Sequence, residues 1–348
     1  MVGIHRPKAG GSVLILAVWT LLFLSVIAVA VGARVSSHMD LAWNLSNRAV
    51  CYYSAKAGVE AAEAVIRGGT NSWIDLSQDW NKGSEFLVDI TVGEGVFTVF
   101  HVELAADGRS VTNFGVIDED RKVNINAATN DAGRQLVRSL IEVAGGIDAE
   151  KAEGIAACIA DWIDKDDEVR ERGSESGQGP AGNQSIRCHN GRIDFLEELL
   201  LVKDVDTNLF VRIAPYLRVY GTNMGVNINT ADPVVLRALA GTRKGVDREV
   251  AARLVERILE FRKGGGAFSE RDKKSIRTAL FGNGEISGNA RAESAVMEWL
   301  INHRLIAVQS RYFYGISQGG LSRGSAAFRR IAFVYDGNTD EIRAWNEQ

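Results

Sequence analysis

Cysteine, histidine and proline are scarce in this 348-residue chain, which has three, five and four of them respectively. No C-x-x-C pair occurs and no two histidines stand at metal-ligand spacing, which argues against zinc and thioredoxin-like chemistry. The zinc-protease motif H-E-x-x-H and the phosphate-loop motif are also absent. A formal net charge of −4 argues against a general nucleic-acid binder, which normally has a basic surface. We therefore predict that this protein is not an enzyme and that it binds no nucleic acid.

The few cysteines still allow one prediction about covalent structure. In an oxidising compartment, Cys158 and Cys188 are a candidate disulfide pair across the loop that separates them. Cys51 would then stay free on an N-terminal helix. The sequence cannot supply the geometry that would decide the pairing.

The first 34 residues combine a basic leader, a glycine pair and an apolar run. Arg6 and Lys8 lie in the leader, and the run from Val13 to Val31 contains no charged residue. Its length approaches the roughly 20 residues needed to cross the hydrocarbon layer of a membrane. The positive-inside bias keeps the leader in the cytoplasm and sends everything after Arg34 across. We expect residues 12–33 to span a bacterial inner membrane once, followed by a periplasmic C-terminal domain.

Three interpretations of this N-terminal segment remain open. Ala28-Val29-Ala30 matches a signal-peptidase site, and an uncleaved single-pass anchor is the second reading. The third is that residues 1–11 resemble the leader of a type IV pilin. In that family a prepilin peptidase cuts before the apolar helix, which here means between Gly11 and Ser12, or less favourably after Gly10.

The resemblance to pilins draws attention to the fifth residue of the mature chain. Most pilins have Glu there, and its carboxylate is thought to neutralise the amino terminus of the subunit assembled before it. Here the position is Leu16, or Ile15 if cleavage follows Gly10. Because a charge in lipid is costly unless paired, a subunit without this Glu is expected where no neighbour lies ahead, at a filament tip.

Beyond the membrane, the pattern predicts a continuous helix and then a sheet. Apolar residues recur at helical spacing, and Gly68-Gly69 ends the pattern, which predicts a helix of roughly fifty residues from the start of the membrane run. The residues of this stripe are Leu41, Leu45, Tyr52, Val59, Ala62 and Ile66. Strand patterns follow at 86–90, 96–102 and 111–117. Residues 34–120 are thus expected to form a stem helix and the first strands of a pilin-like sheet.

The next part of the chain contains an internal repeat. The segment 123–128 (VNINAA) is echoed at 226–231 (VNINTA), and amphipathic helices are predicted after each copy. Asparagine caps helices and closes turns, which gives the repeated N-x-N a structural role. The second copy also resembles a helix-hairpin-helix module, a fold that often binds DNA through hairpin backbone amides. Its hairpin, 240–246, departs from the tight Gly-x-Gly turn of that module.

Several short motifs follow one another along nearly the whole chain. They are 53–58 (YSAKAG), 117–119 (IDE), 122–126 (KVNIN), 161–168 (DWIDKDDE), 197–203 (EELLLVK), 215–221 (PYLRVYG), 310–313 (SRYF), 331–335 (IAFVY) and 345–347 (WNE). Together with the apolar helix that lacks an acidic fifth residue, this ordered set resembles the type II secretion system protein K family, the large minor pseudopilins.

The resemblance implies an α+β fold with a large inserted helical domain. A pilin-like long N-terminal helix would pack on an antiparallel sheet, with residues 121–305 forming the inserted α-helical domain. The C-terminal strands, 306–348, would then complete the sheet. Other minor pseudopilins in a hetero-oligomeric tip complex, the prepilin peptidase and the inner membrane are the implied partners.

The densest acidic segment of the chain is the candidate metal site. Counting Asp164 as position one, oxygens fall at positions one, three, five and twelve, as for several EF-hand ligands. Val169 stands at position six, where an EF-hand needs glycine, so the segment is not an EF-hand. The family resemblance implies calcium here. The candidate ligands are Asp164, Asp166, Glu168 and Glu175, with Asp161 and Asp167 as further candidates. Lys165, Arg170 and Arg172 support the alternative of a solvated, locally paired helix end.

These features lead to one principal functional hypothesis and one rival. The principal hypothesis is a minor pseudopilin at the tip of a type II secretion pseudopilus. It would nucleate or cap filament assembly with other minor pseudopilins during protein export across the outer membrane. The stripe through Leu45, Tyr52 and Val59 is the candidate surface for neighbouring subunits. The rival is a membrane-anchored helix-hairpin-helix DNA-binding protein of the competence type, which would use Arg243 and Lys244.

Overall fold

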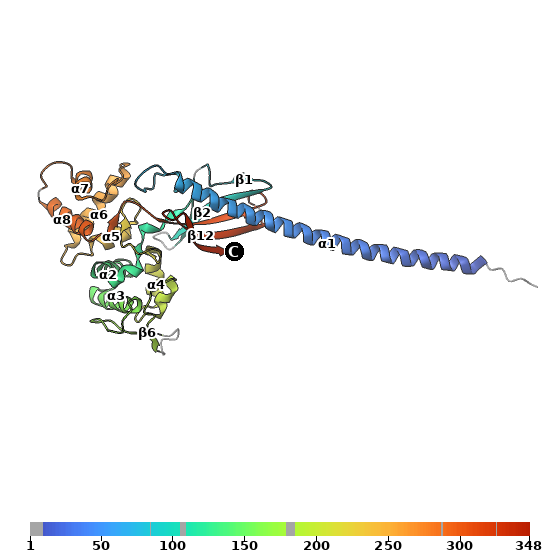
Figure 1. Cartoon of the computed structure of the whole chain (residues 1–348), viewed down its shortest axis with the longest axis horizontal. Helices are drawn as coiled ribbons and strands as arrows, with labels where there is room; N and C mark the ends of the chain where they lie inside the picture. The colour runs from blue at the N-terminus through green and yellow to red at the C-terminus, as the bar shows by residue number, and fades with distance from the viewer. Residues whose placement is uncertain (1–9, 84, 105–108, 179–184, 287, 325) are drawn as a thin grey trace, which may run out of the picture.

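The computed structural model describes residues 10–83, 85–104, 109–178, 185–286, 288–324 and 326–348. Its longest element is α1 (Gly10–Arg67), one continuous helix of 58 residues that projects far beyond a globular body (Figure 1). By length and composition, α1 is the one helix among the described residues that is able to cross a membrane. The prediction of a single long helix ending at Gly68-Gly69 is confirmed.

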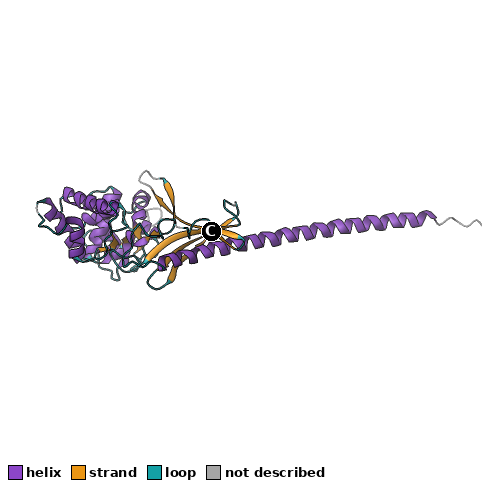
Figure 2. Ribbon diagram, turned by 90° about the horizontal axis from the view of Figure 1, so that it is seen from above, coloured by secondary structure: helices purple, strands orange, loops and turns teal. Residues whose placement is uncertain are grey.

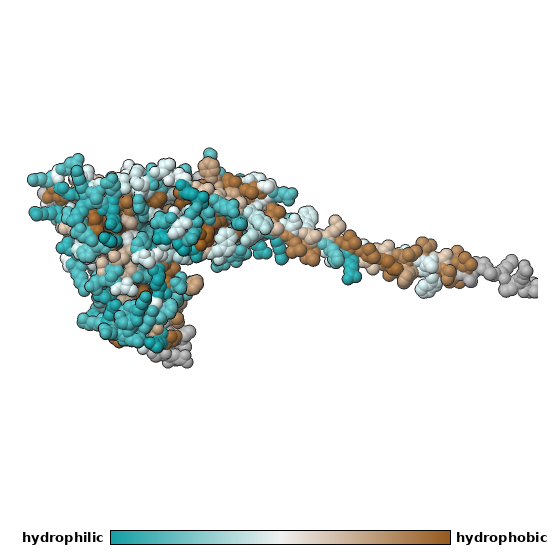
Figure 3. Space-filling view, viewed as in Figure 1, coloured by the Kyte–Doolittle hydropathy of each residue, from teal (hydrophilic) through white to brown (hydrophobic). Residues whose placement is uncertain are grey.

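The two halves of α1 have different surroundings. Its side chains are exposed from Val13 to Ser46, and apolar residues dominate this projecting part (Figure 3). Burial starts at Cys51 and continues at three- and four-residue steps along one face. The buried positions are Cys51, Ser54, Ala55, Gly58, Val59 and Ala62. The predicted stripe is thus divided: Val59 and Ala62 are buried on the sheet, whereas Leu41 and Leu45 lie on the projecting part, 58% and 56% exposed.

The buried half of α1 packs on an antiparallel sheet (Figure 2). The strand order is β1-β2-β11-β12-β13, with β3 paired to β2 and β4 paired to β11. The bounds are β1 Ile90–Val92, β2 Gly95–Leu104, β3 Ser110–Phe114, β4 Ile117–Asp118, β11 Tyr312–Gly320, β12 Phe328–Asp336 and β13 Glu341–Glu347. Early and late strands thus share one sheet through the β2–β11 pairing. A long helix on an antiparallel sheet is the predicted pilin-like arrangement.

Glycine allows close contact between helix and sheet. Gly319 of β11 lies directly against the helix backbone, where a Cβ atom would overlap Ala55 N and Cys51 O. A Cβ at Gly58 of α1 would in turn overlap Ser317. The glycines therefore let α1 and β11 approach more closely than side chains would permit.

Two strand predictions need correction. At 86–90 strand pairing starts only at Ile90, because Asp89 has a φ of 54°, outside the extended region. Leu87 is instead buried in the core, and its carbonyl accepts a hydrogen bond from Val99 N at 2.7 Å. The segment 111–117 is divided into β3 and β4 by Gly115, whose φ of 93° turns the chain.

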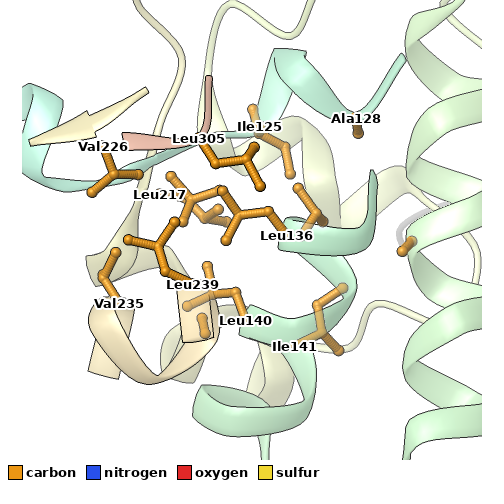
Figure 4. Close-up of a cluster of buried hydrophobic side chains, with 14 of the residues drawn as sticks. Ile125, Ala128, Leu136, Leu140, Ile141, Leu217, Val226, Val235, Leu239 and Leu305 are labelled. Carbon is orange, nitrogen blue, oxygen red and sulfur yellow. The ribbon is translucent and has the colours of Figure 1, made fainter. Parts of the chain in front are cut away.

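Helices make up most of the chain between β4 and β11. They are α2 Asp131–Gly145, α3 Ala149–Ile163, α4 Thr207–Ile213, α5 Pro233–Ala240, α6 Arg248–Lys263, α7 Lys273–Phe281 and α8 Asn289–Asn302. Short 3₁₀ helices are η1 Glu119–Arg121, η2 Ile125–Thr129, η3 Leu196–Leu201 and η4 Ala214–Tyr216. Their core is separate from that beneath the sheet. Figure 4 shows Leu136 and Leu140 of α2 facing Leu239 of α5 across this core.

Three small two-stranded sheets complete the helical part. β5 (Val123–Asn124) pairs in parallel with β8 (Leu217–Arg218), and β9 (Val226–Asn227) pairs in parallel with β10 (Ile306–Ala307). β6 (Ser176–Gln178) pairs with β7 (Ser185–Arg187) in an antiparallel hairpin. The repeated N-x-N segments therefore lie on corresponding parallel strand pairs.

The repeated asparagines have matching structural roles. In both copies the first Asn accepts a bond at 3.0 Å from the backbone N–H two residues on, Asn124 from Asn126 and Asn227 from Asn229. The second Asn forms two hydrogen bonds with the backbone of a distant residue. Asn126 bonds Ile193 at 2.8 and 2.9 Å, and Asn229 bonds Phe268 at 2.8 and 3.0 Å. These amides satisfy buried backbone groups, as predicted for a structural repeat.

A buried polar network joins the sheet to the helical part. Asp118 of β4 accepts hydrogen bonds from Thr230 Oγ1 at 2.5 Å and Ser310 Oγ at 2.6 Å. Burial, reinforced by the nearby charge of Asp120, raises the pKa of Asp118 to about 6. Asp120 forms a salt bridge of 2.8 Å with Arg218, and both side chains are almost completely excluded from solvent. The orientation of the two parts thus depends on charges that must remain paired.

Candidate metal centre

The acidic segment lies where α3 ends and the loop toward β6 begins. Asp148 caps the N-terminus of α3, and Asp164 is its C-cap residue in an extended conformation. Nine consecutive α3 residues, 155–163, are buried, which fixes the end of the helix in the core. The loop then turns back, and Arg170 N donates to Asp161 Oδ2 at 3.3 Å. Carboxylates distant in the loop therefore come together at one end of α3.

Three of the predicted ligands form a compact group. One carboxylate oxygen each from Asp164, Asp166 and Glu175 lies within 4.8 Å of the others. Asp164 Oδ1 and both carboxylate oxygens of Glu175 are buried without a hydrogen-bond partner among the described residues. Burial raises the pKa of Glu175, and the negative charges of Asp161 and Asp164 raise it further. Unpartnered, mutually repelling oxygens are the donor set that a hard cation would stabilise.

Arg170 supplies the positive charge nearest to this group. Its Nη1 donates to Asp161 Oδ1 at 2.8 Å and also contacts Asp164 Oδ2. Asp161 is fully buried and Asp164 is 9% exposed, so the guanidinium neutralises two carboxylates that have little access to water. Both carboxylate oxygens of Asp161 therefore accept a hydrogen bond from Arg170, one from its backbone N–H and one from its side chain.

The remaining predicted ligands lie apart from the group. Asp167 accepts hydrogen bonds from Asn190 Nδ2 at 3.0 Å and from Arg187 Nη2 at 3.3 Å, and these bonds lower its pKa. Glu168 has an exposed carboxylate, and the backbone N–H of Glu168 donates to Asp166 Oδ1 at 3.0 Å. Of the local pairing suggested in the sequence, Arg170 pairs with Asp161 and Asp164 and Arg172 pairs with Glu150. Asp167 pairs with Arg187, which that alternative did not include.

Asn190 is a residue of this site that the sequence analysis missed. Its Nδ2 donates to the backbone oxygen of Asp166 at 3.1 Å, while its Oδ1 is buried and has no partner among the described residues. A side-chain amide oxygen is one of the hard oxygens that bind calcium, alongside carboxylates. No spacing pattern marks Asn190, because it reaches the loop only through the fold.

The predicted disulfide is absent, since Cys51, Cys158 and Cys188 are all free thiols. Cys158 Sγ points to Arg172 O at 3.9 Å, and Cys188 Sγ points to Ser174 O at 3.5 Å. Each sulfur is therefore directed at the backbone of the intervening loop. Burial raises the pKa of Cys158 to about 11 and that of Cys188 to about 12, which keeps both thiols protonated and unreactive.

The residues of the predicted cleavage site lie at the start of α1. Gly11 and Ser12 belong to its first turn, and Leu16 is 67% exposed on the projecting part. The preceding leader residues, 1–9, are outside the described residues. The position of cleavage stays a prediction.

One segment matches the sequence of a hydrolase motif but does not have the backbone geometry of that motif. Residues 315–319 (GISQG) fit G-x-S-x-G, which in α/β-hydrolases places serine at an exposed strand-to-helix turn. Here the segment lies inside strand β11, and Ser317 is completely buried. Its hydroxyl faces α1, where it would be overlapped by a side chain at Gly58. This serine has no access to a substrate.

The helix-hairpin-helix pattern corresponds to α5 and α6, which residues 241–247 connect. Arg243 and Lys244 are exposed in this connection. The asparagines that precede α5 are buried and bonded as described above, so they belong to the framework of the domain. DNA binding by the hairpin stays an untested alternative.

Comparisons with known proteins show which proteins this chain is similar to. A sequence profile for type II secretion system (T2SS) protein K matches residues 120–222, which include η1, the two helices before the acidic loop and the loop itself. The chain is 25% identical over 230 residues to type II secretion system protein K of Pectobacterium carotovorum subsp. carotovorum, covering 65% of this chain and 67% of that protein. It is also 25% identical over 234 residues to protein K of Klebsiella pneumoniae, covering 66% and 68%.

A solved structure has the same fold. The match is to a chain in the crystal structure of the GspK-GspI-GspJ complex from the enterotoxigenic Escherichia coli type 2 secretion system, with a TM-score of 0.58. It covers 90% of this chain and 99% of that chain at 18% sequence identity. The α+β fold and its large helical insertion are therefore shared with that structure. The profile and both relatives name one protein, so the chain is similar to type II secretion system protein K.

Proposed function

We propose that this chain is the minor pseudopilin that caps the tip of a type II secretion pseudopilus and helps to begin its assembly. The observation that carries the proposal is the projecting half of α1, which is apolar, uncovered and without a carboxylate at Leu16. Similarity to protein K supports a structural role in the secretion system and gives no support to enzymatic activity.

The exposed surface just beyond the membrane segment is the proposed contact for neighbouring subunits. If residues 12–33 lie in the inner membrane, the next apolar side chains project into the periplasm with nothing covering them. Four of these are more than half exposed: Met39, Leu41, Trp43 and Leu45. Met39 and Trp43 lie on one face of the helix and Leu41 and Leu45 on the opposite face. Exposed apolar surface of this kind marks protein interfaces. Val59 is buried against the sheet, so it is not part of the contact surface that the sequence suggested.

Other minor pseudopilins are the proposed occupants of this surface. The related crystal structure is a complex of GspK with GspI and GspJ. The corresponding proteins of this secretion system would pack their own N-terminal helices against the Met39–Leu45 segment. This arrangement would place the sheet and the helical part of the chain at the periplasmic end of the filament.

The mature N-terminus tests membership of the pilin class. We expect Edman sequencing of the protein recovered from membranes to begin at Ser12 when prepilin peptidase is present, and at the original terminus when it is absent. Gly11→Val should block this cleavage, whereas Gly10→Val should leave it intact if the cut follows Gly11. An unprocessed chain in the presence of the peptidase would contradict the proposed role and leave an anchored periplasmic domain.

The tip position is tested by giving Leu16 the carboxylate of an ordinary pilin. Leu16→Glu places a charge in the membrane helix with no preceding amino terminus to pair with, at a cost of at most about 2.5–3.5 kcal/mol, the value for a charge at the centre of a membrane helix. We expect pseudopilus assembly and co-purification with the other minor pseudopilins to fall, while Leu16→Met behaves like the natural chain. Unchanged assembly by the Leu16→Glu variant would count against the tip position.

We also propose that the acidic group at the end of α3 binds calcium. Asp164, Asp166 and Glu175 would hold the ion, with Asn190 Oδ1 as a neutral oxygen beside them. The support is the set of buried oxygens without partners on Asp164, Glu175 and Asn190. Calcium takes six to eight hard oxygens in flexible geometry, so backbone carbonyls and water would complete its coordination.

Calcium would change the electrostatic balance of the loop. In its absence Arg170 is the cation closest to Asp164, and Glu175 is left with unpaired negative charge. A divalent ion between the three carboxylates would remove that repulsion while Arg170 stays with Asp161. The ion would thereby fasten the loop after α3 to the segment that follows β7. Its proposed role is structural, because the ion would connect two segments of the fold.

A further inference from the structure

A second polar feature lies in the helical part, separate from the acidic group. A cleft of about 1270 Å³ opens between the helix pair α2–α3 and the connection from α5 to α6. Residues 241–246 of that connection form one wall, and the first turn of α3 forms part of the opposite wall. The helices that follow the two copies of the internal repeat, α2–α3 and α5–α6, therefore enclose the cleft between them.

Positive charge dominates this cleft although the whole chain is acidic. Eight lining residues are Arg or Lys and five are Asp or Glu, an excess of three positive charges in a chain whose net charge is −4. The N-terminus of α3 adds the positive end of a helix dipole, because Asp148 and Ala149 line the same cleft. Such a surface attracts carboxylates and raises their local concentration.

The acidic residues inside the cleft neutralise its cations only in part, and Arg134 and Arg170 pair with carboxylates outside the lining. Arg172 pairs with Glu150 at 3.2 Å. Glu142 is shared between Arg138 at 2.9 Å and Arg248 at 3.4 Å. Glu153 is shared between Arg138 at 3.6 Å and Lys244 at 4.0 Å. Glu142 and Glu153 therefore each serve two cations, and the longer contacts leave donors available.

Two guanidinium groups in the cleft have no salt bridge at all within the described part of the chain. They belong to Arg237, near the end of α5, and Arg243, in the connection that follows, and both are exposed. Arginine presents a planar fork of donors that matches a carboxylate with two parallel hydrogen bonds. Uncommitted guanidiniums at the edge of a cleft are thus suited to receive carboxylates from outside.

We propose that this cleft binds an acidic segment of another protein, an exposed stretch of polypeptide that carries several spaced Asp or Glu residues. A peptide suits the mixed lining better than a nucleic acid does. The carboxylates of Glu142, Glu150 and Glu153 would repel the continuous phosphate charge of a nucleic acid. A peptide can place its carboxylates at Arg237 and Arg243 and its backbone amides beside the glutamates.

The proposal is tested by fluorescence anisotropy with the full-length chain in detergent micelles. The probe is a short fluorescein-labelled peptide in which glutamates are separated by pairs of glycine or serine. A matched peptide has glutamine at each glutamate position, and a short labelled DNA duplex tests the alternative ligand. We expect the glutamate peptide to bind, its affinity to fall with added salt, and the glutamine peptide to bind at least about tenfold more weakly.

Two charge-reversal variants locate the binding surface. Arg243→Glu with Lys244→Glu alters the cleft, where Lys244 has only a 4.0 Å salt bridge and Arg243 has none. Lys273→Glu with Lys274→Glu is the matched control on α7, outside the cleft, where Lys273 has a 3.9 Å salt bridge to Glu298. Both double variants change the net charge equally and replace exposed residues.

We expect the cleft variant to weaken binding of the glutamate peptide at least about tenfold and the α7 variant to leave it nearly unchanged. Circular dichroism and thermal melting establish that both variants fold. Equal weakening by the two variants would reduce the effect to overall charge and overturn the proposal. Absence of peptide binding, or tighter binding of the DNA duplex with the same dependence on Arg243 and Lys244, would also overturn it.

Discussion

Replacing Arg218 with methionine is expected to lower the free energy of unfolding by about 3–5 kcal/mol. Arg218 lies on β8 with its side chain completely buried, and its Nη2 pairs with Asp120 Oδ1 at 2.8 Å. The same guanidinium donates to Tyr220 O and to Asn223 O. Methionine fills much of the volume but leaves the Asp120 charge and two carbonyl oxygens without this donor. The cost arises because a buried charge that loses its partner cannot be solvated by water.

The expected loss of stability is large because Asp120 bonds to residues of both the sheet and the helical part. Its Oδ2 accepts from the backbone N–H groups of Arg311 and Tyr312 at 2.6 and 3.0 Å, at the start of β11. Arg218 on the other side belongs to the helical part. The salt bridge therefore fixes where the chain leaves the helices and re-enters the sheet. Breaking it should loosen this junction as well as destabilise the fold.

Urea unfolding followed by tryptophan fluorescence measures this effect on the full-length chain. Arg212→Met is the matched control, because Arg212 is exposed on α4 and donates a single hydrogen bond to Asn208 O. We expect the control to change stability by no more than about 0.5 kcal/mol. Adding Asp120→Asn to Arg218→Met should recover part of the loss by removing the unpaired charge. Equal effects of Arg218→Met and Arg212→Met would contradict the role assigned to the buried pair.

The second large effect concerns calcium. At a free calcium concentration about 100-fold above the dissociation constant, binding should stabilise the folded chain by about 2.7 kcal/mol. We expect the thermal unfolding midpoint to rise by several degrees on addition of calcium and to return on addition of a chelator. Magnesium should have a smaller effect, because it requires a tighter octahedral arrangement than a flexible loop provides.

Asp166→Asn with Glu175→Gln tests the proposed ligands while preserving the rest of the loop. These changes remove two of the three grouped carboxylates and leave the contacts of Arg170 with Asp161 and Asp164 in place. The variant should fold without calcium at least as well as the natural chain, because Glu175 loses its repulsion from Asp161 and Asp164. The calcium-dependent rise should disappear.

A control with the same change of charge is available in the neighbouring segment. Asp194→Asn with Glu197→Gln alters two exposed carboxylates outside the acidic group. This variant should retain the full response to calcium. If the Asp166→Asn, Glu175→Gln variant still responds to calcium, the ion binds elsewhere. If the natural chain shows no response, the acidic group is a cluster of surface charges and not a calcium site.

Periodic patterns predicted the elements of this protein well because they depend on local chemistry. The apolar run and the small-residue face that follows it predicted one continuous helix, and Gly68-Gly69 marked its end. The repeated N-x-N predicted a repeated structural role, since an asparagine that caps a turn acts on residues close to it. Strand boundaries were less accurate, because φ values such as those of Asp89 and Gly115 follow from tertiary contacts.

The composition of the acidic site was readable in the sequence, but its geometry was not. The dense carboxylates and the family resemblance indicated a cation site in the loop after α3. Only the fold shows that Asp164, Asp166 and Glu175 come together, while Arg170 occupies both oxygens of Asp161 and Arg187 pairs with Asp167. Asn190 joins the site from the other side of the β6–β7 hairpin, at a distance that spacing patterns do not register.

By itself, the sequence determined the membrane-length helix, the pilin-like order of elements and the resemblance to type II secretion system protein K. These depend on hydrophobic periodicity and on short ordered motifs, which are properties of neighbouring residues. The tertiary structure alone decided where α1 becomes buried, which acidic side chains come together and that two repeats enclose a basic cleft. Each of these requires residues far apart in the chain to meet, and that meeting is determined by the packing of the core and the pairing of buried charges.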